Sequence, residues 1–189
     1  IKLEAQAAQK KTVTIDRDGR DWTIGVVEVP SFYMDYQAMI AGEEDYTSTT
    51  RDVRKLIAEL EEEGVDGLVM DLRGNGGGHL AEARALSGLF IPDGPVVQLR
   101  QSNGRIEVLT DKDPTIAYNG PLVVLVDRYS ASASEIFAAA IQDYGRGIVV
   151  GQQTFGKGTV QNLFPLDRYK RAPNPGFGQL TLTIGKYYR

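Results

Sequence analysis

The chain has 189 residues, 42% of them hydrophobic and 24% charged, which is enough for one globular domain with a buried core. Its formal net charge of -4 argues against a nucleic-acid-binding protein, because phosphate contacts need clustered Lys and Arg. The absence of cysteine excludes thiol nucleophiles, disulfides and cysteine-ligated zinc, and the single histidine, His79, excludes multi-histidine metal sites. We therefore expect neither a metal nor a cofactor.

The N-terminal part of the chain predicts a linker followed by two strands. Residues 1–10 have no clear period and are interpreted as a linker, which leaves residues 11–189 for the folded core. Thr12–Asp16 alternates, and Trp22–Val29 is rich in β-branched residues, so both are predicted strands. The acidic, Tyr-rich stretch Ser31–Thr47 is predicted to be irregular.

The middle of the chain predicts alternating helices and strands. The apolar residues of the first helix recur at i, i+3, i+4 and i+7 from Val53, with Ser48 or Thr49 as the N-cap and Gly64 as the stop. Further helices are predicted to begin near Leu80 and near Ser132. The predicted strands that accompany them are Gly67–Leu72, Val96–Leu99, Ile106–Leu109, Leu122–Val126 and Ile148–Val150.

This alternation predicts an α/β core with right-handed crossovers between parallel strands. Two further strands, Val160–Phe164 and Leu180–Tyr188, follow the core and are interpreted as added β-structure. A polar loop with Pro173 and Pro175 separates them.

Three serines, Ser130, Ser132 and Ser134, lie between a predicted buried strand and a predicted helix. A serine at a helix N-terminus is favoured by the helix dipole and has free backbone N–H groups beside it. Such donors can stabilise an oxyanion. The alternative is that the three serines only cap the helix.

A serine nucleophile needs a base, and Lys157 is a candidate because Gly156 and Gly158 let the backbone bend around it. Lysine can accept a proton when burial keeps it neutral near pH 7. The glycine turn Gly74–Gly78 follows a predicted buried strand. It either gathers backbone N–H groups into an anion-binding nest or is only a strand-to-helix turn that needs positive φ.

Three stretches, Asp71–Gly78, Ser130–Ile136 and Thr154–Gln161, together resemble the carboxyl-terminal processing, or tail-specific, serine proteases. Leu122–Arg128 and Asp143–Arg146 are similar to the bacterial tail-specific branch of that family. The resemblance implies an α/β, crotonase-like core of sheet and helices, with additional β-strands at the ends. It also implies that the chain is truncated at its C-terminal end and lacks an upstream PDZ domain, from which residues 1–10 would be the linker.

The resemblance assigns a Ser–Lys dyad in which Ser132 is the nucleophile and Lys157 the general base, supported by Gln161. Asp143 corresponds to a position that supports the site, structurally rather than chemically. If the dyad is assembled, Ser132 Oγ and Lys157 Nζ are expected at hydrogen-bond distance, and if it is at rest, they are expected further apart across one shared cleft.

The resemblance also assigns an oxyanion hole, formed by the backbone N–H of Ala133 and that of Gly78, with Gly77 as the near alternative. The implied activity is endoproteolysis of unfolded or tagged proteins that have apolar carboxyl termini, by hydrolysis of an acyl-enzyme. The implied location is the bacterial periplasm, with membrane association as a further possibility. The implied partners are the PDZ domain in cis and an adaptor protein.

Three alternatives stay open at this point. Gly151–Lys157 has the Gly-x-x-x-x-Gly-Lys spacing of a nucleotide-binding loop, although Gly158 stands where Ser or Thr should bind magnesium. The chain could instead be a non-catalytic peptide-binding module on the same fold. Finally, Ser132 could use His79 as its base.

Overall fold

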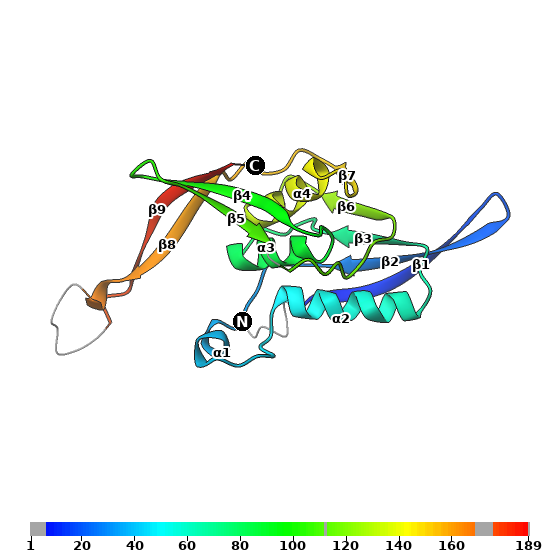
Figure 1. Ribbon diagram of the computed structural model, residues 1–189, viewed down its shortest axis with the longest axis horizontal. Coiled ribbons are helices and arrows are strands. Elements are labelled where there is room, and N and C mark those ends of the chain that lie inside the picture. Colours follow the sequence, from blue (N-terminus) through cyan, green and yellow to red (C-terminus); the bar gives the residue numbers. More distant parts are fainter. Residues whose placement is uncertain (1–6, 112, 169–175, 189) are drawn as a thin grey trace.

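The computed structural model describes residues 7–111, 113–168 and 176–188, which form two sheets and the helices packed against them (Figure 1). The first sheet has the strand order β1-β2-β3-β6-β7, in which β1 and β2 form an antiparallel hairpin and the remaining neighbours are parallel. Its strands are β1 (Gln9–Arg17), β2 (Arg20–Glu28), β3 (Gly67–Asp71), β6 (Leu122–Val126) and β7 (Ile148–Gly151). The central strands β3 and β6 are nearly continuous apolar runs, as expected for parallel strands covered on both faces.

The second sheet is antiparallel and has the order β5-β4-β9-β8. Its strands are β4 (Gly94–Gln101), β5 (Ile106–Asp111), β8 (Thr159–Pro165) and β9 (Gln179–Tyr188). A short 3₁₀ helix, Leu166–Arg168, follows β8. The ribbon of β8 and β9 extends from the body on the side opposite to the β1–β2 hairpin (Figure 1).

The helices connect the strands and cover the first sheet. They are α1 (Tyr36–Ala41), α2 (Thr49–Glu62), α3 (Leu80–Gly88) and α4 (Ala133–Asp143). Helix α2 runs alongside the β1–β2 hairpin, and α3 packs against α4 (Figure 1). At that helix pair the rings of Phe90 and Phe137, both fully buried, meet edge to face with 5.7 Å between their centroids.

Capping residues mark the ends of α2. Ser48 is the N-cap of α2, and its side chain accepts a hydrogen bond from Arg51 N, while Gly64 takes a φ of 75° just after the C-cap. The mixed α/β fold and the predicted helices and strands are confirmed, with shifts of a few residues at their ends.

Two predictions about the N-terminal part are wrong. The stretch Ser31–Thr47 contains α1, whose N-cap Asp35 accepts from two backbone N–H groups and whose C-cap Gly42 is left-handed. Residues 8–10 belong to the core rather than to a linker, because Ala8 is buried and donates to the hydroxyl of Tyr33, and β1 begins at Gln9. The predicted loop with Pro173 and Pro175 lies outside the described residues.

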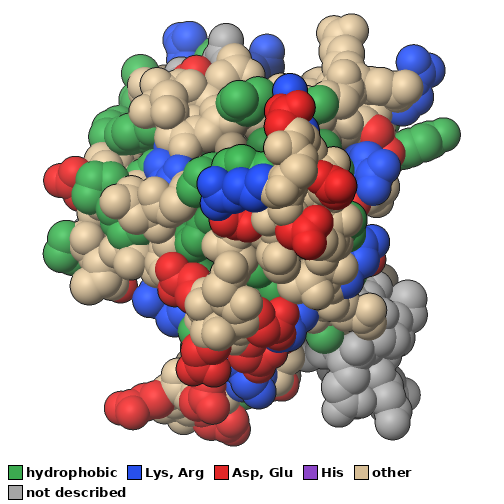
Figure 2. All heavy atoms as spheres, turned by 90° about the vertical axis from the view of Figure 1, so that its right-hand side faces the viewer, with side chains coloured by type: hydrophobic (Ala, Val, Ile, Leu, Met, Phe, Trp, Pro, Cys, Tyr) green, Lys and Arg blue, Asp and Glu red, His purple; other side chains and the backbone are tan. Residues whose placement is uncertain are grey.

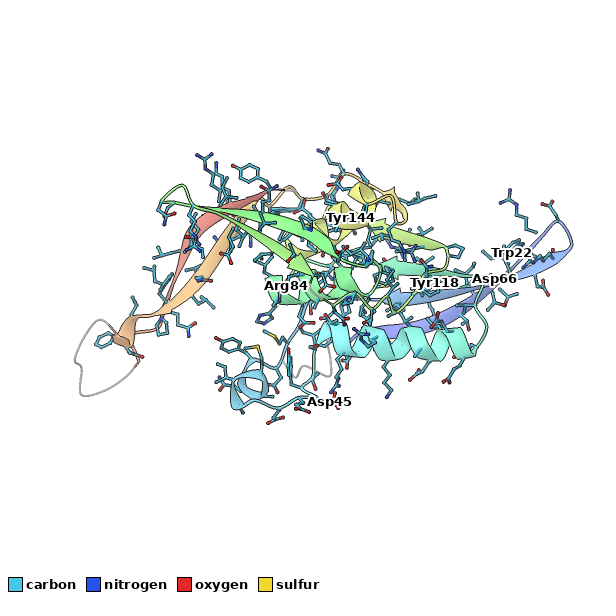
Figure 3. The ribbon with its side chains drawn as sticks, in the orientation of Figure 1. Trp22, Asp45, Asp66, Arg84, Tyr118 and Tyr144 are labelled. Atoms are coloured by element: carbon cyan, nitrogen blue, oxygen red, sulfur yellow. The ribbon has the colours of Figure 1, made fainter. Side chains whose placement is uncertain are left out.

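The β1–β2 hairpin is fixed to the body near its turn. Trp22 and Asp66 lie beside each other there (Figure 3), the Arg20 guanidinium lies 3.8 Å over the Trp22 ring, and Arg20 also pairs with Asp66. On the face drawn in Figure 2, Lys and Arg side chains are interspersed with Asp and Glu, and acidic groups gather on its lower part. No helix in the described ranges is both long and apolar enough to span a membrane.

Candidate active site

Ser132 stands at the turn between β6 and α4 in an unusual backbone conformation. Its φ is 57° and its ψ is -112°, and Asp18 is the only other described non-glycine residue with a positive φ. A serine in this region is strained, and such strain persists where the surrounding structure fixes the residue, commonly at functional sites. The sharp turn presents Ser132 at the N-terminus of α4, where the helix dipole favours negative charge.

The two serines that flank Ser132 hold the turn in place. Ser130 Oγ donates to Leu72 O at 2.8 Å, and Ser134 Oγ donates to Asn75 O at 2.9 Å. Both flanking serines are fully buried, whereas Ser132 is partly exposed and lines a cavity. The structure therefore separates the three serines of the motif into two structural residues and one that is open to a ligand.

The glycine turn after β3 packs directly against the serine turn. A Cβ on Gly77 would lie 2.7 Å from Ala131 O and 2.8 Å from Ser132 Cβ, and one on Gly78 would lie 2.1 Å from Phe32 O. The buried Asn75 ties the two turns together, because its backbone carbonyl accepts from Ala131 N at 3.0 Å in addition to the Ser134 hydroxyl. These contacts leave no room for side chains at the two glycines.

Two backbone N–H groups beside Ser132 are unoccupied. Among the described residues no hydrogen bond is donated by the N–H of Ala133, the first residue of α4, or by that of Gly78. The N–H of Gly77 instead donates to Asn75 Oδ1 at 2.9 Å. In this conformation the hydrogen of Gly77 N is therefore already bonded, whereas that of Gly78 N is not.

Lys157 and Ser132 line the same cavity, which has a volume of about 440 Å³. Gln161 also lines it, together with Gly78 and Ala133. No hydrogen bond joins Lys157 Nζ to Ser132 Oγ in the part of the chain that is described, so the amine is not in position to accept the proton in this conformation. Both groups therefore line one cleft without a hydrogen bond between their side chains.

Glu135 links the serine turn to the lysine loop, a role that the sequence did not reveal. Its carboxylate accepts hydrogen bonds from Ser132 N at 2.8 Å, Gly156 N at 2.6 Å and Lys157 N at 2.9 Å. One side chain thus fixes the backbone of both residues of the predicted dyad. The available signal was a glutamate three residues after a helix N-cap, the spacing of a capping box, which by itself indicates only a helix start.

Asp127 orders the opposite ends of the same two turns. Its carboxylate accepts from Gly74 N at 3.0 Å and from Tyr129 N at 2.9 Å. These hydrogen bonds, chiefly the one from Gly74, hold the pKa of Asp127 below its usual value. The glycine turn therefore binds an internal carboxylate at its beginning, while the N–H of Gly78 at its end donates to no described residue.

Two of the candidate residues lie away from the cavity. Asp143 ends α4, eleven residues after Ser132, which places it about 16 Å along the helix at 1.5 Å per residue. Its neighbour Tyr144, labelled in Figure 3, donates to Pro95 O at 3.0 Å and attaches this helix end to β4. His79 is the exposed N-cap of α3 and does not line the cavity.

The nucleotide-loop alternative does not fit the structure. A phosphate-binding loop leads into a helix, but Gly151–Lys157 leads into the strand β8. The N–H groups of Gly156 and Lys157 donate to Glu135, so they do not converge on an external anion.

Comparison with known proteins identifies relatives along the whole chain. Residues 23–189 match Peptidase family S41. The chain is 48% identical over 190 residues to a tail-specific protease of Haemophilus influenzae, covering 100% of this chain and 25% of that protein. It is 38% identical over 156 residues to the carboxy-terminal processing protease CtpA of Bacillus subtilis, covering 82% of this chain and 30% of that protein.

A solved structure of a photosystem II D1 C-terminal processing protease superposes with a TM-score of 0.73 at 27% identity. That match covers 96% of this chain and 43% of the other. The chain thus spans about a quarter to a third of the two curated relatives named above.

Proposed function

Because this chain belongs to peptidase family S41, we propose that it carries the active site of a serine endopeptidase in which Ser132 is the nucleophile and Lys157 the general base. One observation carries the proposal above all. Ser132, in its strained turn, shares a cavity with Lys157 and with two residues, Gly78 and Ala133, whose backbone N–H groups are free. Nucleophile, base and oxyanion donors are the parts that acyl transfer requires.

The reaction that these groups support proceeds through an acyl-enzyme. Neutral Lys157 accepts the Ser132 proton as Oγ forms a bond to the carbonyl carbon of the substrate, whose oxygen becomes an oxyanion between Gly78 N and Ala133 N. The carbon–nitrogen bond then breaks, and the lysine ammonium gives its proton to the leaving amine. Water attacks the ester as Lys157 takes its proton. The bond between the carbonyl carbon and Oγ then breaks, and the lysine ammonium returns the proton to Oγ, which releases the carboxylic acid and restores Ser132.

The first step needs a change in the position of the lysine side chain. Four rotatable bonds let an ammonium or amine swing over several ångströms, and hydrogen bonds of a catalytic site often form only when substrate is bound. The backbone of Lys157 is held by Glu135 and need not move. Gln161, on β8 and in the same cavity, is placed to accept or donate a hydrogen bond once the amine swings in.

The shape of the cavity supports an extended polypeptide substrate. Five consecutive residues of β8, from Thr159 to Leu163, line it, and β8 is an edge strand that pairs only with β9 among the described strands. An unpaired strand edge offers N–H and C=O groups to a chain that lies alongside it. Leu80, Ile136 and Leu163 add apolar walls, which suits apolar residues near the cleaved bond.

We extend the proposal to the whole protein by family membership. The substrates would be unfolded or tagged proteins with apolar carboxyl-terminal tails, read by a PDZ domain upstream in cis, with an adaptor protein as a possible further partner. The proposed site of action is the periplasm.

The test compares cleavage of two peptides that differ only at their carboxyl-terminal tail, one apolar and one charged. Ser132→Ala and Lys157→Ala should abolish cleavage and acylation of the chain by p-nitrophenyl acetate. The matched controls Ser102→Ala and Lys55→Ala, at exposed positions away from the cavity, should leave both unchanged. Peptide binding without any cleavage would favour the peptide-binding module, and loss of activity in His79→Gln would favour the histidine as base.

A further inference from the structure

Tyr187 carries a buried hydroxyl that has no hydrogen-bond partner among the described residues. A buried hydroxyl without a partner is destabilising, so its retention at a particular place calls for an explanation. This hydroxyl lies at the cavity of the candidate active site, which Tyr187 lines together with Ser132 and Lys157.

The backbone of Tyr187 is rigidly placed. Strand β9 is paired on both sides, and Tyr187 lies opposite Leu99 of β4. On the other side, Tyr187 N donates to Gly158 O at 3.1 Å, in the residue that follows Lys157. The tyrosine therefore holds the lysine loop with its main chain, while its ring reaches toward the serine turn.

The hydroxyl interacts with the Ser132 side chain and with the charge of the Glu135 carboxylate. Burial and the charge of Glu135 raise the pKa of Tyr187 to about 12, and an interaction with the Ser132 hydroxyl opposes that rise. The tyrosine is therefore protonated near neutral pH and available as a donor. Glu135 already accepts three backbone hydrogen bonds, whereas Ser132 Oγ, which accepts from Glu135 N in the capping box, keeps a second acceptor position.

We propose that Tyr187 is a positioning residue for the nucleophile, whose O–H donates to Ser132 Oγ and directs the serine hydrogen toward Lys157. This inference rests on the proposed function of Ser132. A serine hydroxyl can donate one hydrogen bond and accept two, so it can give its hydrogen to the lysine amine while it accepts from the tyrosine. As Oγ becomes negative in the attack, the same hydrogen bond becomes charge-assisted and stronger, which lowers the barrier.

The test is Tyr187→Phe, which removes the hydroxyl and keeps the ring. The expected result is a fall of about 10- to 100-fold in kcat, the range for one lost hydrogen bond to a charged group, with KM unchanged. The rate of Ser132 acylation by p-nitrophenyl acetate should fall by a similar factor, because it reports on the nucleophile without peptide binding. Tm should change little, because the hydroxyl has no hydrogen-bond partner in this conformation and the ring that packs at the cavity is kept.

A loss of activity without a loss of stability separates positioning from a merely structural role. The matched control is Tyr188→Phe, the exposed neighbour on the same strand, for which no change is expected. Unchanged kcat and acylation in Tyr187→Phe, or a fall of both together with Tm, would overturn the inference. If Ser132→Ala retains activity, or the chain is not acylated at all, the proposed function itself fails, which is a different outcome from failure at Tyr187 alone.

Discussion

Replacing Glu135 with Gln tests whether one carboxylate aligns the two halves of the site. In the native chain Oε2 accepts from Ser132 N and Lys157 N, and Oε1 accepts from Gly156 N. A glutamine oxygen can replace one of these oxygens, but the amide nitrogen in the other position is itself a donor and faces an N–H group. At least one charge-assisted hydrogen bond is lost, and the others become neutral.

The expected size follows from these bonds. A hydrogen bond to a charged group contributes about 1.5–3 kcal/mol, and a neutral one about 0.5–1.5 kcal/mol. We expect Glu135→Gln to lower the free energy of unfolding by about 2 kcal/mol, the lower part of that range being appropriate because Glu135 is only half-buried. The effect on kcat/KM should be larger, about 100-fold, because a displacement of about 1 Å in catalytic groups has that effect.

The assay combines denaturant unfolding with peptide cleavage. Glu135→Asp keeps the charge with a shorter side chain and should fall between the wild type and the glutamine variant. Glu62→Gln, an exposed glutamate at the end of α2, is the matched control and should change neither quantity. Wild-type cleavage by Glu135→Gln would refute the argument that this carboxylate sets the geometry of the dyad.

Three further predictions follow from the same contacts. Gly78→Ala should abolish cleavage by displacing the glycine turn, because a Cβ at Gly78 would lie 2.1 Å from Phe32 O. Ser132→Ala should also abolish cleavage, but it should leave the turn in place. Crystal structures of both variants test this difference. Ser134→Ala should lose about 1 kcal/mol of stability with the bond to Asn75 O, and should retain activity, as urea unfolding and peptide cleavage would reveal. The pKa of Tyr187 is raised from 10.0 to about 12, so the stability that its protonated form contributes is present below pH 10 and is lost as the pH rises toward 12. In Tyr187→Phe the free energy of unfolding should therefore fall less between pH 10 and pH 12 than in the wild type, as alkaline unfolding would measure.

The sequence was most informative where periodicity and chemistry agreed. The apolar spacing from Val53 predicted α2, and the run Leu122–Val126 is β6 as predicted. The helix α1 was missed because it is short and has no buried face, although Asp35 and Gly42 were available as its cap signals. The place of Ala8 in the core depends on the hydroxyl of Tyr33, a tertiary contact that no local pattern reports.

The sequence suggests the chemistry of the candidate site, but it does not give the alignment of its residues. The serine turn and Lys157 were identified from motifs, yet spacing along a chain cannot say whether two side chains meet across a cavity. The roles of Asn75 and Glu135 depend on hydrogen bonds to backbone groups. Every residue type has these backbone groups, so the sequence does not identify the partner. The choice between Gly77 and Gly78 required knowledge of which N–H was already bonded.

The two halves of the site belong to sheets of unequal burial. Ser132 follows β6, most of whose side chains are enclosed, whereas Lys157 precedes β8, a largely exposed edge strand of the outer sheet. Segments with few buried apolar contacts open more readily than the centre of a fold. Thermal inactivation should therefore begin with fraying of the ribbon of β8 and β9, at temperatures where the first sheet is still intact. The loss of catalysis and the loss of the fold should then be separate events.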